Sequence, residues 1–319
     1  MDCVTIILVT YNQEKYIYES IDSILMQDYE NIQLIITDDA SDYFDVDVVR
    51  SYVTDKKCKN LTDLVVLKNE KNLGTVKNLN RARKYLKGKY MMLLAGDDLL
   101  YDNKVLSNYA KYFSNDIDMI VSQVLHYDEN MEQVMFRCLN DEQIELLKTG
   151  DNRSIYGKVC TECFIPAMGI MCSTEFLKKM GDYDERYYLI EDWPFLLKAF
   201  RENVRMMYAD FVAAKHRDGG VSHNKKTRKE ERGDRFHQDL INIIRDEVFP
   251  NYQYAEESMQ KDVYNYANDR IVLSEYRSRF WKMTIIEKIT WICKNKNLPA
   301  VFFRGCKRRI RFRKNKVHT

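Results

Sequence analysis

Glycine and proline are scarce in this sequence, with 11 and 4 of the 319 residues. This scarcity excludes collagen-like and low-complexity proteins, in which these residues dominate. Hydrophobic residues make up 45% of the chain, which excludes an intrinsically disordered protein. The length fits one large domain or two smaller ones.

Long apolar runs and a basic leader are also missing. No stretch of about 18 uncharged apolar residues occurs, which argues against a membrane-spanning helix. The start Met1-Asp2-Cys3-Val4 has no features of a secretory signal. We therefore expect a cytoplasmic protein, and we expect its eight scattered cysteines to be free thiols. The single close pair, Cys160 and Cys163, is weak support for zinc, and incidental cysteines are favoured.

Charge is uneven along the chain. Eight of the 50 basic residues and none of the 48 acidic ones lie in residues 299–319, which leaves the rest of the chain net acidic. Just before this basic tail, apolar residues recur near helical spacing: Trp281, Ile285, Ile286, Ile289 and Ile292. An apolar helix face followed by a basic tail predicts contact with an anionic membrane surface. The alternative is a helix that packs on the protein with a solvated tail; nucleic acid is disfavoured because no recognition motif accompanies the basic run.

Strand-like and helix-like segments alternate over the first 125 residues. Apolar runs typical of buried strands occupy residues 3–10, 32–37, 63–67, 90–95 and 119–124. Helical spacing follows two of them, over residues 16–25, with Asn12 as the expected N-cap, and over residues 76–85. Asn72-Leu73-Gly74 predicts a turn with a positive-φ glycine. The order predicts a doubly wound α/β sheet, followed by a helical region after residue 225.

Polar residues follow three of the predicted strands. Thr10-Tyr11-Asn12, Asp38-Asp39 and Asp97-Asp98 stand where an open α/β sheet binds ligands, at the carboxyl ends of its strands. The sequence around Asp97-Asp98 offers no obvious counter-ion, and two adjacent carboxylates favour a raised pKa or a bound cation. Oxygen ligands select Mg²⁺ or Mn²⁺. An inert, solvated acidic turn is the alternative reading.

Five motifs in order carry a family resemblance: Val9-Thr10-Tyr11-Asn12, Thr37-Asp38-Asp39-Ala40-Ser41, Asn72-Leu73-Gly74, Leu94-Ala95-Gly96-Asp97-Asp98 and Ile190-Glu191-Asp192-Trp193. Over about residues 3–223 the chain resembles glycosyltransferase family 2, inverting sugar transferases of the GT-A fold. The resemblance implies a Rossmann-like, mostly parallel sheet flanked by helices. It places a GT-A domain at residues 1–225, with a nucleotide-sugar half at 1–100 and an acceptor half at 101–225. Residues 226–319 would form the helical C-terminal region with its basic tail.

The resemblance also implies roles for individual residues. Thr10, Tyr11, Asn12 and Glu14 would line the nucleotide pocket, and Asp38 or Asp39 would accept a hydrogen bond from the base. Asp97 and Asp98 would hold Mn²⁺ or Mg²⁺ on the diphosphate, with Asp98 the direct ligand. His216 would be a further metal ligand or a diphosphate contact. The family's acidic motif usually carries an Asp where Gly96 stands and sometimes another where Ala95 stands, so the number of carboxylates on the metal is open.

An inverting transfer needs a carboxylate that takes a proton from the acceptor hydroxyl. Asp192 is the expected general base, with Glu191 as the fallback base or an acceptor-orienting residue. Pro194 and the apolar residues after it predict a helix start here, whose N–H groups would keep the carboxylate ionised. A plain N-cap is the alternative role of Asp192, and both roles can coexist.

The expected activity is therefore transfer of a sugar from a nucleotide-sugar donor, most simply a UDP-sugar, to a saccharide acceptor. Bacterial surface polysaccharide synthesis, with a lipid-linked acceptor at the inner face of the plasma membrane, fits the basic tail. A sugar-phosphate nucleotidyltransferase is one alternative, but the segment after the first strand lacks the glycine-rich basic loop that it needs. A catalytically inactive nucleotide-sugar-binding protein is the other. A homo-oligomer is an open expectation.

Overall fold

The structure is a computed structural model that describes residues 1–56, 58–219, 231–278, 283–295, 301 and 304. Within these residues one nine-stranded sheet has the order β3-β2-β1-β4-β8-β6-β9-β5, and β7 pairs with β6. The strands are β1 (Val4–Thr10), β2 (Ile32–Asp38), β3 (Leu61–Lys68), β4 (Tyr90–Ala95), β5 (Leu99–Leu100), β6 (Met119–Tyr127), β7 (Val134–Arg137), β8 (Ile170–Ser173) and β9 (Met206–Arg217). The predicted α/β class is confirmed.

The N-terminal half of the sheet is parallel. β3, β2, β1 and β4 pair in parallel, with Thr10 opposite Asp38 and Val9 opposite Ala95. β1 and β2 are buried on both faces because helices cover each side, which explains their unbroken apolar sequence. The chain runs from β1 to β2 and β3 and then returns to place β4 on the other side of β1. A topological switch point therefore lies between β1 and β4.

The other half of the sheet is mixed. β8 is antiparallel to both β4 and β6, whereas β9 is parallel to β6 and antiparallel to β5. The pairing of Leu99 with Lys215 brings the end of β9 beside the segment that follows β4. The sequence analysis did not identify β9, since charged residues such as Asp210 and Lys215 interrupt its apolar pattern.

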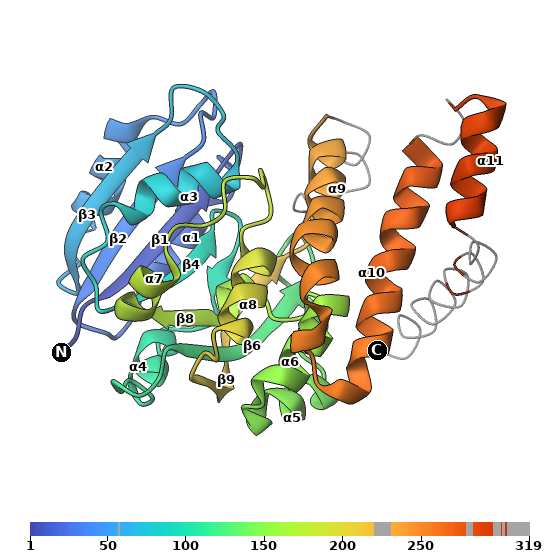
Figure 1. Cartoon of the computed structure of the whole chain (residues 1–319). Coiled ribbons are helices and arrows are strands. Elements are labelled where there is room, and N and C mark those ends of the chain that lie inside the picture. The colour runs from blue at the N-terminus through green and yellow to red at the C-terminus, as the bar shows by residue number, and fades with distance from the viewer. Residues whose placement is uncertain (57, 220–230, 279–282, 296–300, 302–303, 305–319) are drawn as a thin grey trace.

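Helices cover both faces of the sheet (Figure 1). One core cluster joins the sheet to α3, α6, α7 and α8, and the other joins it to α1, α2 and α4. The helices before residue 220 are α1 (Ile17–Leu25), α2 (Val46–Asp55), α3 (Thr75–Arg83), α4 (Val105–Ala110), α5 (Asp141–Thr149), α6 (Asn152–Thr161), the short η1 (Ala167–Gly169), α7 (Thr174–Met180) and α8 (Asp192–Arg201).

One local prediction is wrong. Asn12 does not cap α1, which begins at Ile17 with Tyr16 at the N-cap position and no side-chain cap. Asn12 instead has a φ of 54°, and its backbone N–H donates to the Ser41 hydroxyl at 2.7 Å. Asn12 therefore belongs to a turn that joins the ends of β1 and β2.

The region after β9 is helical, as predicted. It comprises α9 (Glu231–Ile243), the π-helical η3 (Ile244–Val248), the 3-10 segment η4 (Phe249–Tyr254), α10 (Glu257–Ser278) and α11 (Ile285–Lys294). Apolar residues from Ile243 to Ala267 join the same core cluster as α6 and α8, so these helices pack directly on the body. The predicted boundary at 225/226, Trp281 and the basic residues after Arg304 lie outside the described residues, and the division into two domains stays a prediction.

α11 stands apart from this packing. It lies beside α10 at the side of the molecule away from β1–β3 (Figure 1), and its Trp291 packs in a separate small cluster with Val272 and Val301. Among the described helices, none combines the length and the apolarity that a membrane crossing needs.

Candidate active site

The carboxyl ends of β1, β2 and β4 bring the predicted donor residues together. Thr10 is buried opposite Asp38, and the N–H of Gly96 donates to the Val9 carbonyl at 2.8 Å. A Cβ added to Gly96 would lie 2.9 Å from the Thr10 hydroxyl, so the chain after β4 passes directly against the end of β1. The acidic pair thus begins at the switch point that the topology defines.

Asp98 is buried and tied to β9. Its Oδ1 accepts from His216 Nδ1 and from the backbone N–H of Arg217, each at 2.9 Å. Its Oδ2 is buried without a hydrogen-bond partner in the described part of the chain. The sequence next to the acidic pair offers no counter-ion, and the structure brings His216 and Arg217 to it from a strand about 120 residues later.

Arg217 is a site residue that the sequence analysis missed. The side chain is buried, and its guanidinium donates to the backbone carbonyls of Asp97 and Glu129 and to the Glu19 carboxylate. It also stacks 4.2 Å from the centre of the Tyr16 ring. Its place beside His216 in the sequence was the available signal, but only the sheet pairing shows that it reaches the acidic pair.

Asp97 is half-buried next to this network. Burial and the adjacent Asp98 carboxylate raise the pKa of Asp97 to about 6. Burial opposes the charged form of His216, but the Asp98 carboxylate outweighs it, and the pKa of His216 is raised. Two neighbouring carboxylates, one with an unsatisfied buried oxygen, are suited to a cation.

A complete protein cage for a metal is not formed. Within the described residues no group of three or more His, Cys, Asp and Glu side chains is placed to hold a metal ion. Mg²⁺ commonly binds through one or two carboxylates, with waters and substrate phosphates completing its shell. The acidic pair fits that mode, in which the ligand set is completed by the substrate.

Asp38 and Asp39 are both buried and hydrogen-bonded. Asp38 accepts from the backbone and the hydroxyl of Ser41; burial raises its pKa in spite of these bonds. Asp39 accepts from Asn69 Nδ2 and from the N–H groups of Leu73 and Gly74, at 2.8 to 2.9 Å. Both carboxylates therefore hold loops in place, and their contact with a nucleotide base stays a prediction.

The remaining predicted donor residues lie in the turn after β1. Tyr11 is half-buried, whereas Asn12 and Glu14 are exposed. Their position beyond the carboxyl end of β1 is compatible with a nucleotide pocket, and their roles as pocket residues stay predictions.

The second acidic pair lies where α8 begins. α8 starts at Asp192, with Glu191 at the N-cap position, so the predicted helix start is confirmed. Asp192 Oδ1 accepts from the N–H of Trp193 at 2.7 Å, and Oδ2 lies 4.0 Å from the exposed Cys163 thiol.

The electrostatics of this pair differ from the expectation. Burial raises the pKa of Asp192, although the Trp193 N–H opposes the shift. Burial and the Asp192 carboxylate raise the pKa of Glu191 to about 8. The helix N-terminus therefore does not outweigh burial, and the ionised form of Asp192 is less favoured than the sequence suggested.

A chain of contacts links Asp39 to the loop that precedes the second acidic pair. Gly74, which Asp39 holds, has a φ of 86°, and an added Cβ would lie 2.6 Å from the Tyr188 carbonyl oxygen. The Tyr188 hydroxyl also bonds to Asn72. The loop before Glu191 is thus pressed against the loop that follows β3, a contact for which the sequence gives no local signal.

Comparisons with known proteins agree with this arrangement. The model of the family described as Glycosyl transferase family 2 matches residues 5–171, just over half of the chain. An uncharacterized glycosyltransferase of Methanocaldococcus jannaschii is 28% identical over 67% of this chain and 70% of its own length. The Escherichia coli protein WfgD, named UDP-Glc:alpha-D-GlcNAc-diphosphoundecaprenol beta-1,3-glucosyltransferase, is 26% identical over 70% of this chain and 80% of its own.

Among solved structures, the mannosyltransferase PcManGT of Pyrobaculum calidifontis, in complex with GDP-Man and Mn²⁺, superimposes with a TM-score of 0.56. The superposition covers 93% of this chain and 80% of that chain at 16% identity. At this identity the likeness shows the fold, which is the expected GT-A arrangement of a central sheet with flanking helices.

The Asp98 network predicts an asymmetry between the two adjacent aspartates. Asp98→Ala leaves His216 Nδ1 and the Arg217 N–H without their buried acceptor, and we expect it to lower the free energy of unfolding by about 3 kcal/mol. Asp97→Ala removes a carboxylate that Asp98 repels, and we expect it to change the free energy of unfolding by less than about 1 kcal/mol. Urea unfolding of the two variants measures the difference, and equal losses would contradict the network.

The raised pKa of Glu191 predicts a pH-dependent stability. The folded protein holds a proton on Glu191 that the unfolded chain releases, so this stabilisation is complete below the ordinary glutamate pKa and is lost as the pH rises towards about 8. Glu191→Gln should therefore raise the melting temperature at pH 8.5, by about 2–4 °C per kcal/mol relieved, and much less at pH 5.

Thermal unfolding of wild type and Glu191→Gln at both pH values measures this effect. Glu202→Gln, at the exposed far end of the same helix, is the matched control and should show no pH-dependent gain. A gain that is equal at pH 5 and pH 8.5 would show that Glu191 is not held neutral by the fold.

Proposed function

The chain belongs to glycosyl transferase family 2, and on that premise we propose that it transfers a sugar, with inversion, from a UDP-sugar to a saccharide acceptor. The observation that carries the proposal is the pairing of two acidic centres at one edge of the sheet. Asp97-Asp98 lies at the switch point, and Glu191-Asp192 lies on the loop that contacts the neighbouring Gly74 turn. A transferase of this kind needs one centre for the donor diphosphate and one for the acceptor hydroxyl.

The choice of UDP rests on a relative. WfgD, by its name, uses UDP-Glc, whereas the structural neighbour PcManGT holds GDP-Man. WfgD is 26% identical to this chain and PcManGT 16%, which favours UDP as the nucleotide. The turn of Thr10, Tyr11, Asn12 and Glu14 would then contact the nucleoside, with Asp38 or Asp39 as the acceptor for the base.

The donor diphosphate is proposed to bind with Mn²⁺ or Mg²⁺. Asp98 Oδ1 already has two donors, and its Oδ2, which has no hydrogen-bond partner among the described residues, is buried, whereas Asp97 keeps exposed surface. We therefore propose Asp97 as the direct metal ligand and Asp98 as the residue that positions His216 near the ion. This assignment reverses the expectation from the sequence, in which Asp98 was the direct ligand. A divalent ion bound here would stabilise the negative charge on the leaving diphosphate. The Mn²⁺ in PcManGT supports such a site in this fold.

Asp192 is proposed as the general base. Burial and the Asp192 carboxylate raise the pKa of Glu191 to about 8, and burial also raises the pKa of Asp192. We propose that the pair shares one proton at neutral pH and that Glu191 holds it. Asp192 is then the carboxylate that can accept the acceptor's proton. A protonated Glu191 beside it can donate a hydrogen bond that orients the acceptor hydroxyl.

The acceptor is proposed to be a lipid-linked saccharide of surface polysaccharide synthesis. WfgD is named for an acceptor on diphosphoundecaprenol, a membrane lipid. Such an acceptor requires the enzyme to work at a bilayer surface, here the cytoplasmic face. A homo-oligomer stays a prediction.

α11 provides an apolar surface for that membrane contact. Trp291 is turned towards α10, which leaves the isoleucines on the outer side: Ile285, Ile286, Ile289 and Ile292 are 76%, 77%, 58% and 45% exposed. The helix therefore does not pack on the body through its isoleucines. Eight basic residues with no acidic ones follow in residues 299–319, and each is worth about 1 kcal/mol near an anionic surface. The apolar face of α11 and the basic charge that follows it together fit binding to an anionic bilayer.

The proposed transfer predicts different defects in two variants. Isothermal titration of UDP, GDP, CDP and dTDP, each with and without Mn²⁺, should show metal-dependent binding of UDP by the wild type. Asp97→Asn should lose the metal dependence. Asp192→Asn should bind UDP as the wild type does and lose transfer by about 10²- to 10⁴-fold. Failure of every nucleotide to bind would refute the donor site, and full activity of Asp192→Asn would remove it as the base.

The membrane contact predicts co-sedimentation with vesicles of phosphatidylglycerol and phosphatidylcholine, weakened by salt and lost with phosphatidylcholine alone. Ile285→Glu together with Ile286→Glu should abolish sedimentation. Val48→Glu together with Val134→Glu, which places the same two charges at exposed valines of α2 and β7, is the control and should bind as the wild type does. Sedimentation of the double variant at the wild-type level would contradict a role for α11.

A further inference from the structure

The loop between α7 and α8, residues 181–191, ends on the second acidic pair. It has no regular secondary structure, so its conformation depends on side chains from other elements. Side chains of α3, η3 and α9 hydrogen-bond to residues of this loop.

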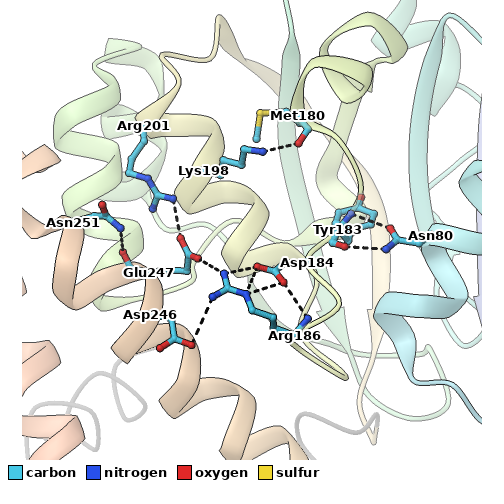
Figure 2. Close-up of polar contacts among 10 residues, drawn as sticks. All are labelled: Asn80, Met180, Tyr183, Asp184, Arg186, Lys198, Arg201, Asp246, Glu247 and Asn251. Atoms are coloured by element: carbon cyan, nitrogen blue, oxygen red, sulfur yellow. Dashed lines mark hydrogen bonds and ion pairs between the residues drawn. The ribbon is translucent and has the colours of Figure 1, made fainter.

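The first part of the loop is held from α3 and η3 (Figure 2). Asn80 on α3 bonds both backbone groups of Tyr183, at 2.9 Å each. Arg186 binds Asp184 of the same loop and Glu247 of η3, and Glu247 also binds Arg201 of α8 at 2.8 Å. These contacts fix the loop between the nucleotide half and the start of the C-terminal helices.

The last part of the loop is held by α9 as well as by α3 and the turn before it. Asp239 Oδ2 accepts from the backbone N–H groups of Tyr188 at 2.9 Å and Leu189 at 2.6 Å. Asp239 is only 4% exposed, so its charge is stabilised by these two donors and not by water. One turn earlier on α9, the guanidinium of Arg235 lies 4.5 Å from the centre of the Tyr188 ring.

The hydrogen bonds of Asp239 reach the loop two residues before the Glu191-Asp192 pair. They also lie at the contact between this loop and the Gly74 turn of the nucleotide half. Leu189 is separated from Glu191 by one residue, and the Tyr188 carbonyl faces Gly74 and receives the N–H of Val76. Asp239 accepts a hydrogen bond from the backbone N–H of the same residue. A displacement of Tyr188 would therefore move Glu191 and Asp192 relative to the strand ends that carry Asp97.

From these contacts we infer that Asp239 is a positioning residue for sugar transfer, and that α9 of the C-terminal region completes the active site by fixing the Glu191-Asp192 pair. The inference rests on the proposed function, because it assigns the pair a role in the reaction. The hydrogen bonds of Asp239 go to Tyr188 and Leu189 of the loop, so we expect its loss to act on the reacting geometry and not on nucleotide binding. Small misplacements of reacting groups cost about 10²-fold in rate.

The test compares Asp239→Ala, Asp239→Asn and the matched control Asp269→Ala in the full chain. Asp269 is also a buried aspartate of the C-terminal helices, but it binds Arg304, at 2.7 Å, and both residues lie far along the chain from the loop. For Asp239→Ala we expect a fall in kcat of about 10- to 100-fold with an unchanged Kd for UDP. Asp239→Asn keeps an acceptor oxygen and should recover most of the rate. Asp269→Ala should keep the wild-type kcat.

Hydrogen exchange gives a readout that does not depend on activity. Asp239→Ala should lose amide protection in peptides that span residues 186–192, with α10 unchanged. A wild-type kcat in Asp239→Ala, an equal fall in Asp269→Ala, or loss of protection throughout α9 and α10 would overturn the inference. Absence of any sugar transfer by the wild type would instead refute the proposed function, whereas loss of protection at 186–192 alone would still show that Asp239 holds the loop.

Discussion

The buried carboxylate of Asp98 is the interaction on which the candidate site depends. A charge without exposed surface is tolerated only with donors around it, and these come from His216 and Arg217 at the end of β9. Because Asp98 follows β4, this single group ties the parallel half of the sheet to the mixed half. It also sets the position of Asp97, whose backbone carbonyl accepts from the Arg217 guanidinium. The donor side of the site is therefore built across the sheet and not along the chain.

The acceptor side depends on a second series of contacts that starts from Asp39. Asp39 accepts a hydrogen bond from the N–H of Gly74, and Gly74 lies against the Tyr188 carbonyl. The N–H of Tyr188 in turn donates to Asp239 of α9. Each member is buried or in van der Waals contact with the next, so the series passes from the nucleotide half through the acceptor half to the C-terminal helices. Under the proposed function, this series would set the distance between the donor and Asp192 as the base, which is the quantity that an in-line displacement requires.

Local sequence signals predicted the elements that local physics controls. The apolar runs of β1, β2 and β4 mark strands buried on both faces, and the helix start at Asp192 follows from Pro194 and the apolar residues after it. The predictions failed where a distant partner decides the outcome. Asn12 bonds to Ser41 instead of capping α1, and β9 was missed because charged residues such as Asp210 and Lys215 interrupt its apolar pattern. The ionisation of Asp192 was misjudged because burial, which the sequence does not show, outweighs the helix terminus.

The sequence by itself determined the α/β alternation, the order of the five motifs and the placing of polar residues after buried strands. The alternation and the placing of polar residues depend on periodicity and on residues a few positions apart, whereas the five motifs carry the resemblance that implied the family and the GT-A fold. Only the tertiary structure decided which carboxylate is buried and which is exposed, that His216 and Arg217 serve Asp98, and that α9 reaches the loop before Glu191. The reason is physical: a pKa or a hydrogen bond depends on what surrounds a group in space, and the partners of Asp98 and Tyr188 are more than 50 residues away in the chain.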